Sequence, residues 1–151
     1  MTYYSVEVCY KYPKPIKNYC YEKNFPHNDK DSESYKIKIE LETLSSKYNG
    51  EMSAFDYDFI FNTVDDTFNN ISSVNYNYYF DNMFDVNNFI LNLPSKYDII
   101  WIYRKDKNKN KKGNKECVIY MSDKKSDFIK FDDDDKIIYK NILDRIKNTK
   151  K

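Results

Sequence analysis

The sequence predicts an α+β fold, with a mostly antiparallel sheet and about three helices packed on one face. Two observations support this prediction. Segments in which apolar and polar residues alternate, as in a half-buried strand, are interleaved with segments whose apolar residues recur every three or four positions, as in an amphipathic helix. Several neighbouring strand segments also have no helix between them, which favours antiparallel pairing over parallel crossovers.

Length and composition are those expected of one folded domain spanning residues 1–151. The chain is 40% hydrophobic and 18% aromatic, including 16 Tyr and 10 Phe. A charged fraction of 32% also occurs in disordered chains, but disordered chains are poor in aromatic residues. Because the apolar residues fall into periodic segments, we expect a packed core.

Residues 3–12 are predicted to form the first strand. Pro13 and Pro15 are expected to end it, because proline cannot donate a hydrogen bond to a neighbouring strand. The polar residues 14–34 that follow are interpreted as a long surface loop. The β-favouring residues on one face of the strand are Tyr4, Val6, Val8, Tyr10 and Tyr12.

The clearest strand pattern lies at residues 35–44, where Tyr, Ile and Leu alternate with Lys and Glu. A helix is expected over residues 53–72, with Ser53 as its N-cap and apolar residues at helical spacing. Residues 55–59 also fit a strand, and this alternative stays open. Another strand is predicted at residues 74–80.

The second half of the chain is predicted to begin with a short helix capped by Asp85 and ended by Pro94. Residues 97–103 form a largely apolar segment, which indicates a central strand buried on both faces. This strand is expected to pair with residues 116–121. Residues 128–131 are predicted to add a short edge strand.

The final helix is predicted to open at residues 132–135, which are four consecutive Asp residues. Acidic residues at its start and basic residues at its end both suit the helix dipole. Its predicted apolar stripe consists of Ile137, Ile138, Ile142, Leu143 and Ile146.

The scarcity of glycine and histidine excludes several kinds of site. Phosphate-binding loops need glycines where the backbone approaches the ligand, and the chain has only Gly50 and Gly113. The single histidine, His27, excludes metal sites built from several histidines. We therefore expect neither a cofactor nor a metal site.

The cysteines and the aspartate run have structural interpretations. An odd number of cysteines with no CxxC pair argues against a disulfide framework, and Cys117 is interpreted as a buried core thiol. A nucleophile pair of His27 with a cysteine is possible, but structural thiols are favoured, and no catalytic residue is assigned. Residues 132–135 could bind a divalent cation, but they lack the glycine of a calcium loop, so helix capping is favoured. The cysteines are Cys9, Cys20 and Cys117.

Residues 104–115 form a strongly basic connection between two predicted strands. Trp101 and Tyr103 precede it, so a flexible hairpin loop of this kind could follow a phosphate backbone and stack bases. A solvated turn is the alternative interpretation, because AT-rich codons also supply Asn and Lys. The acids elsewhere in the chain, 24 Asp and Glu against 25 Lys and Arg, would weaken long-range attraction. The candidate nucleic-acid-binding residues are Arg104, Lys105, Lys107, Lys109, Lys111, Lys112 and Lys115.

Tyrosine-rich strands suggest a different function. Tyr76, Tyr78 and Tyr79 lie in one predicted strand, and tyrosine is enriched at protein interfaces because its ring is large and its hydroxyl tolerates water. The preferred hypothesis is a non-enzymatic accessory or protein-interaction protein with a protein partner. The alternatives are weak nucleic-acid binding through residues 104–115 and a carboxylate-based hydrolase, whose residues need not be close in sequence.

The expected location is the cytoplasm, since the sequence shows no secretory signal and no apolar run long enough to cross a membrane. The abundant Lys, Asn, Tyr and Ile have AT-rich codons, as is typical of AT-rich protists and of large DNA viruses that infect protists. A viral protein would act in the host cytoplasm or in the virus particle.

Overall fold

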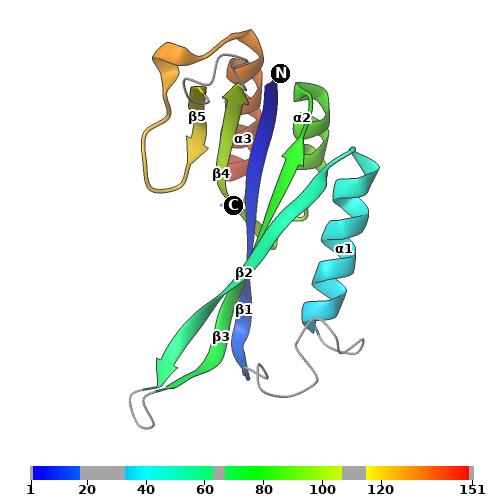
Figure 1. Cartoon of the computed structure of the whole chain (residues 1–151), viewed down its shortest axis with the longest axis vertical. Coiled ribbons are helices and arrows are strands. Elements are labelled where there is room, and N and C mark those ends of the chain that lie inside the picture. Colours follow the sequence, from blue (N-terminus) through cyan, green and yellow to red (C-terminus); the bar gives the residue numbers. More distant parts are fainter. Residues whose placement is uncertain (1, 18–32, 63–66, 107–114, 150–151) are drawn as a thin grey trace.

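A five-stranded antiparallel sheet with three helices on one face forms the protein, as the sequence predicts (Figure 1). The computed structural model describes residues 2–17, 33–62, 67–106 and 115–149. The strands are β1 (Thr2–Lys17), β2 (Glu51–Asn62), β3 (Thr67–Phe80), β4 (Tyr97–Asp106) and β5 (Lys115–Met121), and the helical segments are α1 (Glu33–Lys47), α2 (Met83–Asn92), the 3₁₀ turn η1 (Phe128–Lys130) and α3 (Asp133–Thr149).

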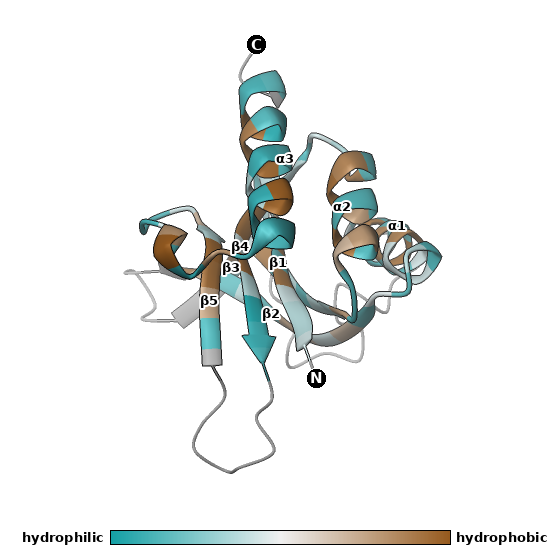
Figure 2. Cartoon of the chain, turned by 90° about the horizontal axis from the view of Figure 1, so that it is seen from above, coloured by the Kyte–Doolittle hydropathy of each residue, from teal (hydrophilic) through white to brown (hydrophobic). Residues whose placement is uncertain are grey.

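The N-terminal strand β1 lies at the centre of the sheet, whose strand order is β2-β3-β1-β4-β5. Val6 pairs with Tyr78 of β3 and with Ile102 of β4, and all three side chains are buried. Because successive side chains of a strand point to opposite faces, this register fixes which residues meet the helices. Figure 2 shows α1, α2 and α3 together on one side of the strands.

The core lies between this face of the sheet and the helices. It is rich in aromatic residues, and several tyrosine rings are almost completely buried in it. Burial of such large rings supplies much of the hydrophobic stabilisation in a protein of this size. The core residues of the sheet include Tyr4, Val6, Val8, Tyr10, Val74, Tyr76, Tyr78, Phe80, Tyr97, Ile99 and Ile102, and those of the helices include Ile37, Leu41, Val86, Phe89, Ile90, Ile138 and Ile142.

Residues 35–44, predicted as a strand, belong instead to helix α1. The alternation of apolar residues is incidental, since Ile39 is exposed, whereas Ile37 and Leu41, four residues apart, are buried on one helical face. Lys, Glu and Leu, which dominate the segment, are good helix formers. Ser34 and Ser45 complete the buried face, and their small polar side chains hide the helical spacing from a search for apolar residues.

The predicted helix at residues 53–72 is also wrong, because β2 and β3 form a long hairpin there (Figure 1). The alternative that residues 55–59 form a strand is confirmed. Aromatic and acidic residues alternate in this segment, and aromatic residues favour strands. The apparent helical spacing arises because aromatic residues are so frequent in the chain.

Three smaller predictions need correction. β1 continues to Lys17 through a register irregularity that accommodates Pro13 and Pro15. The predicted loop at residues 14–34 therefore overlaps the end of β1 and the start of α1. Residues 18–32 lie outside the described part. Residues 128–131 contain the turn η1 rather than an edge strand. The β4 strand is buried on one face only, because its opposite face carries no helix among the described residues.

The last two helices are confirmed. Helix α2 is capped by Asn82, whose side chain accepts a hydrogen bond from the backbone N–H of Asp85, so Asp85 is not the cap itself. In α3 the buried stripe is narrower than predicted, because Ile137 and Leu143 are largely exposed. Among the described helices, none combines the length and the apolar character needed to cross a bilayer.

Helix α1 ends in a tight turn against the core. Asn49 has a left-handed backbone (φ 59°), its N–H donates to the Ser46 carbonyl, and the Gly50 N–H donates to the Ser45 carbonyl at 2.7 Å. This is the paired hydrogen-bond pattern of a Schellman motif. A Cβ atom on Gly50 would lie 2.5 Å from Cε1 of the buried Phe80 ring, so glycine allows the turn to touch the core.

We predict that Gly50→Ala lowers the free energy of unfolding by about 1–3 kcal/mol, because the new methyl group would displace the Phe80 ring. Urea denaturation checks this. Asn49→Gly is the matched control and should change stability by less than about 1 kcal/mol, because glycine adopts the left-handed conformation freely. Equal effects of the two substitutions would contradict the close contact.

Candidate functional site

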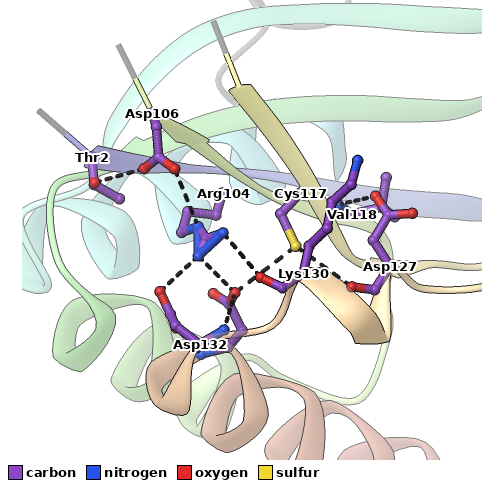
Figure 3. Close-up of polar contacts among 9 residues, drawn as sticks. Thr2, Arg104, Asp106, Cys117, Val118, Asp127, Lys130 and Asp132 are labelled. Carbon is purple, nitrogen blue, oxygen red and sulfur yellow. Dashed lines mark hydrogen bonds and ion pairs between the residues drawn. The ribbon is translucent and has the colours of Figure 1, made fainter. Parts of the chain in front are cut away.

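An ionic cluster, buried at Arg104 and Asp135 and exposed at Asp132, attaches the start of α3 to β4 (Figure 3). Arg104 Nη1 donates hydrogen bonds to Asp132 Oδ2 at 2.6 Å and to Asp135 Oδ2 at 2.8 Å, and Arg104 Nη2 donates to the Lys130 carbonyl at 3.3 Å. Asp106 Oδ2 lies 3.8 Å from Arg104 Nε. The guanidinium group is thus enclosed by acceptors from β4, η1 and α3.

The same aspartates cap helix α3. The Asp135 N–H donates to Asp132 Oδ1 at 2.8 Å, and the Asp132 N–H donates back to Asp135 Oδ2 at 3.0 Å, which is the reciprocal arrangement of a capping box. This confirms the capping role predicted for residues 132–135. Asp135, however, is completely buried rather than solvated. Burial raises its pKa above the ordinary value, while its backbone hydrogen bond and Arg104 act in the opposite direction.

The described cysteines have the properties of structural thiols. Cys9 and Cys117 are both free and buried, as predicted for Cys117. Burial and, second, Asp135 raise the pKa of Cys117 to about 11. Since the thiolate is the reactive form of cysteine, this thiol is a poor nucleophile at neutral pH. Cys20 and His27 lie outside the described residues.

The first two residues of the predicted basic site are paired with acids. Arg104 is held in the cluster above, and Lys105 Nζ lies 3.4 Å from Glu116 Oε1. These pairs reduce the positive charge at the base of the β4–β5 hairpin. Nucleic-acid binding by the remaining lysines stays a prediction. Lys107, Lys109, Lys111 and Lys112 lie outside the described residues, and of Lys115 only the backbone is described, in β5.

The predicted tyrosine surface is only partly correct. Tyr76 and Tyr78 face the helices and are almost completely buried, so neither contributes to a surface. Tyr79 points to the other side of the sheet and is 38% exposed. Its ring packs edge-on against Tyr3 with the ring centroids 5.3 Å apart.

The side of the sheet opposite the helices, called the open face below, has a polar centre. Glu7 of β1 pairs directly with Trp101 of β4 on one side and with Asn77 of β3 on the other. No described helix lies on this face (Figures 1 and 2). By register, the open face includes Ser5, Glu7, Cys9, Asp56, Asp58, Ser73, Asn75, Asn77, Tyr79, Trp101 and Tyr103.

A depression of about 340 Å³ occupies the centre of the open face. Asn77 Oδ1 accepts hydrogen bonds from Ser5 and Ser53, each at 3.1 Å, which fixes one part of its wall. Trp101 lines it, and its indole N–H has no acceptor within hydrogen-bond distance in the described part of the chain. The polar lining residues are Glu7, Ser53, Asp56 and Asn77, and the aromatic ones are Phe55, Tyr79 and Trp101.

Glu7 is the unusual acid of this depression. Burial, followed by the charges of Asp56 and Asp58, raises the pKa of Glu7 to about 7. Asp58 Oδ2 accepts hydrogen bonds from the Ser73 hydroxyl at 2.6 Å and from Asn75 Nδ2 at 3.0 Å. No hydrogen bond or ion pair to the Glu7 carboxylate is present among the described residues, and none of their basic groups offsets the two neighbouring acids. Glu7 could not be predicted as a site residue from the sequence, because a single glutamate on the polar side of a strand forms no motif that indicates a functional site.

The open-face acids do not form a metal centre. Within the described residues, no group of three or more His, Cys, Asp or Glu side chains is placed to hold a metal ion. A carboxyl group with a pKa near 7 beside other acids is the arrangement on which a carboxylate-based hydrolase would rely, so this function also stays a prediction.

Comparison of the chain with protein-family models, with curated protein sequences and with solved structures finds no match. No function is therefore transferred to this protein by similarity.

We predict that removing one partner of the buried Arg104–Asp135 pair is costly. Asp135→Asn should lower the free energy of unfolding by about 3 kcal/mol or more, because Arg104 would be left in a buried site with too little negative charge. Combining it with Arg104→Met should cost less than the sum of the two single changes.

Urea denaturation measures these differences. Lys136→Gln, which breaks an exposed pair with Asp133, is the control and should change stability by less than about 1 kcal/mol. Strictly additive effects of Arg104→Met and Asp135→Asn would show that the pair is not coupled.

We also predict that Glu7 makes the protein less stable at alkaline pH. Folding raises the pKa of Glu7 from 4.5 to about 7. The contribution of Glu7 to the free energy of unfolding is therefore fully present below the unfolded-state pKa and is lost as pH rises through about 7. The urea midpoint of wild type should therefore fall more than that of Glu7→Gln between about pH 5.5 and about pH 8.5. Glu51→Gln, at the exposed start of β2, should follow wild type. Parallel curves for wild type and Glu7→Gln would contradict the shift.

Proposed function

We propose that this protein is a non-enzymatic interaction protein that binds a protein partner on the open face of its sheet. The observation that carries the proposal is the centre of that face, where a half-buried Glu7 lies between Trp101 and Asn77 and has no ion pair with any residue that the structure describes. Partial burial of a carboxylate beside a large aromatic residue, with no compensating partner, costs free energy. A surface with no binding role would not need this arrangement.

The composition of the open face supports a protein partner. Tyr79 and Trp101 belong to the residue types that dominate binding energy at protein interfaces, and Tyr103 lies next to Trp101 with the ring centroids 5.8 Å apart. Ser53 and Asn77, which carry a hydroxyl and an amide group, line the depression together with Tyr79 and Trp101. Aromatic anchors with a polar surround are typical of a non-obligate interface.

The other two candidate functions have weaker support. The described cations at the base of the basic hairpin, Arg104 and Lys105, are occupied by acids, which leaves nucleic-acid binding to lysines 107–112. A hydrolase would require Glu7 and Asp56 to act on a substrate held in the depression, and only the raised pKa of Glu7 favours this. We also propose a cytoplasmic location, which is consistent with the free thiols of Cys9 and Cys117.

A selection of random linear peptides on the immobilised wild-type protein tests the proposal. Selected peptides are then measured by fluorescence anisotropy against two double variants of equal charge change. Asp56→Lys with Tyr79→Ser alters the open face, whereas Leu91→Lys with Ile129→Lys alters exposed positions on α2 and η1. Circular dichroism confirms that both variants are folded.

We expect the selected peptides to bind wild type and the Leu91/Ile129 variant alike, and to bind the open-face variant at least about tenfold more weakly, since interface anchors of this kind are worth more than about 1 kcal/mol each. Peptides that bind both variants equally, or no selected peptide at all, would overturn the proposal.

A further inference from the structure

We propose that the depression on the open face binds the cationic side chain of an arginine from the partner protein. This inference rests on the proposed interaction function and specifies the chemistry that the site recognises. It follows from the charge of the depression, from its aromatic wall and from the absence of any competing cation among the described residues.

The charge of the depression is negative and uncompensated. Glu7 and Asp56 both line it, and neither has an ion pair or hydrogen bond from its carboxylate to another described residue. Some other described acids are engaged by cations, as Glu40 is by Lys96 at 3.1 Å and Asp135 by Arg104 at 2.8 Å. A half-buried carboxylate that lacks such a partner among the described residues is complementary to a cation supplied from outside.

The neighbours of Glu7 show that nothing in the described chain plays this role. On β1 it is flanked on the same face by Ser5 and Cys9, and across the sheet it faces Asn77 and Trp101. Of the charged groups in the described segments, the acids Asp56 and Asp58 of β2 act on it. None of the described helices covers this side (Figure 2).

The aromatic wall favours arginine over a simple ammonium group. Trp101 lies directly opposite Glu7 in the β1–β4 register, and Tyr79 also lines the depression. A guanidinium group is planar, stacks on aromatic faces and can donate two parallel hydrogen bonds to a carboxylate. An arginine side chain can therefore contact Trp101 and Glu7 at the same time.

Other occupants fit less well. A phosphate or nucleic acid would be repelled by the two carboxylates, and an apolar side chain would bury Glu7 further without pairing it. A second copy of the same face would bring like charges together. The described acids also provide no metal centre. An arginine side chain on a peptide avoids all of these conflicts.

Binding of an arginine side chain to Glu7 should depend on pH. Glu7 must be ionised to pair with a guanidinium group, and in the free protein it ionises only around pH 7. Affinity for the arginine probe should therefore rise with pH, by at least about tenfold between about pH 5.5 and about pH 8. A nonspecific surface attraction to aspartates with ordinary titration would not change over this interval.

The test uses Trp101, the single tryptophan of the chain, as its own reporter. The full-length protein is titrated with acetyl-Gly-Arg-Gly-amide and with acetyl-Gly-citrulline-Gly-amide, which has nearly the same shape but no charge. We expect a saturable change in tryptophan emission with the arginine peptide at about pH 8, and a change at least about tenfold weaker with the citrulline peptide, because the charge-assisted hydrogen bonds are lost.

Two substitutions locate the interaction. Glu7→Gln should weaken binding of the arginine peptide by about tenfold and remove its pH dependence, and Asp56→Asn should weaken it less. Glu51→Gln is the matched control and should bind as wild type. Thermal unfolding shows that each variant is folded, and Glu7 is exposed enough for a neutral substitute of the same size to be accommodated.

Equal responses to arginine and citrulline, or arginine binding that is unaffected by Glu7→Gln, would overturn the inference. The proposed function is judged separately. If selected peptides depend on the open face but contain no required arginine, the interaction function stands and the arginine site is wrong. If no selected peptide depends on the open face, the interaction function itself fails.

Discussion

The rest of the structure depends on the position of β1 at the centre of the sheet. Its hydrogen-bonded register with β3 and β4 buries Val6 and Val8 completely against the helices. Glu7 lies between these two residues, so the pleat of the strand forces its side chain onto the opposite face. A shift of one residue would place Glu7 in the core and both valines in water. The exposed position of Glu7 is thus a consequence of the core that holds the sheet together.

Charge is used in two different ways on the two sides of β4. On the helix side, Arg104 is surrounded by Asp132 and Asp135, and this closed network fixes α3 to the sheet. On the open side, Trp101 lies beside Glu7, whose carboxylate has no described counterion. The first arrangement pairs its charges within the described chain and has a structural role. The second leaves a carboxylate without a counterion in the part of the chain that the structure describes, and this difference separates the structural cluster from the candidate site.

The sequence was sufficient for the fold class, because strands with clear alternation, such as residues 74–80, and amphipathic helices with sharp ends keep their local pattern in the folded protein. The prediction of a strand at residues 35–44 was wrong because buried serines, rather than apolar residues, complete the buried face of the helix there. The site could not be predicted, since Glu7, Asp56 and Trp101 come from three strands that register alone brings together. A pattern along the chain has no means of showing which polar residues share the open face of a sheet.

The candidate site depends on Glu7, a partly buried carboxyl group that lies near other acids and has no counterion within the described segments. The most direct measurement is a pH titration of its side-chain carboxyl carbon by NMR, assigned by comparison with Glu7→Gln. The account predicts a midpoint of about 7 in the free protein, which should fall when an arginine-containing peptide binds because a nearby cation favours the ionised form. A midpoint near the ordinary value of 4.5 would show that Glu7 is solvated or already paired, and would contradict the account.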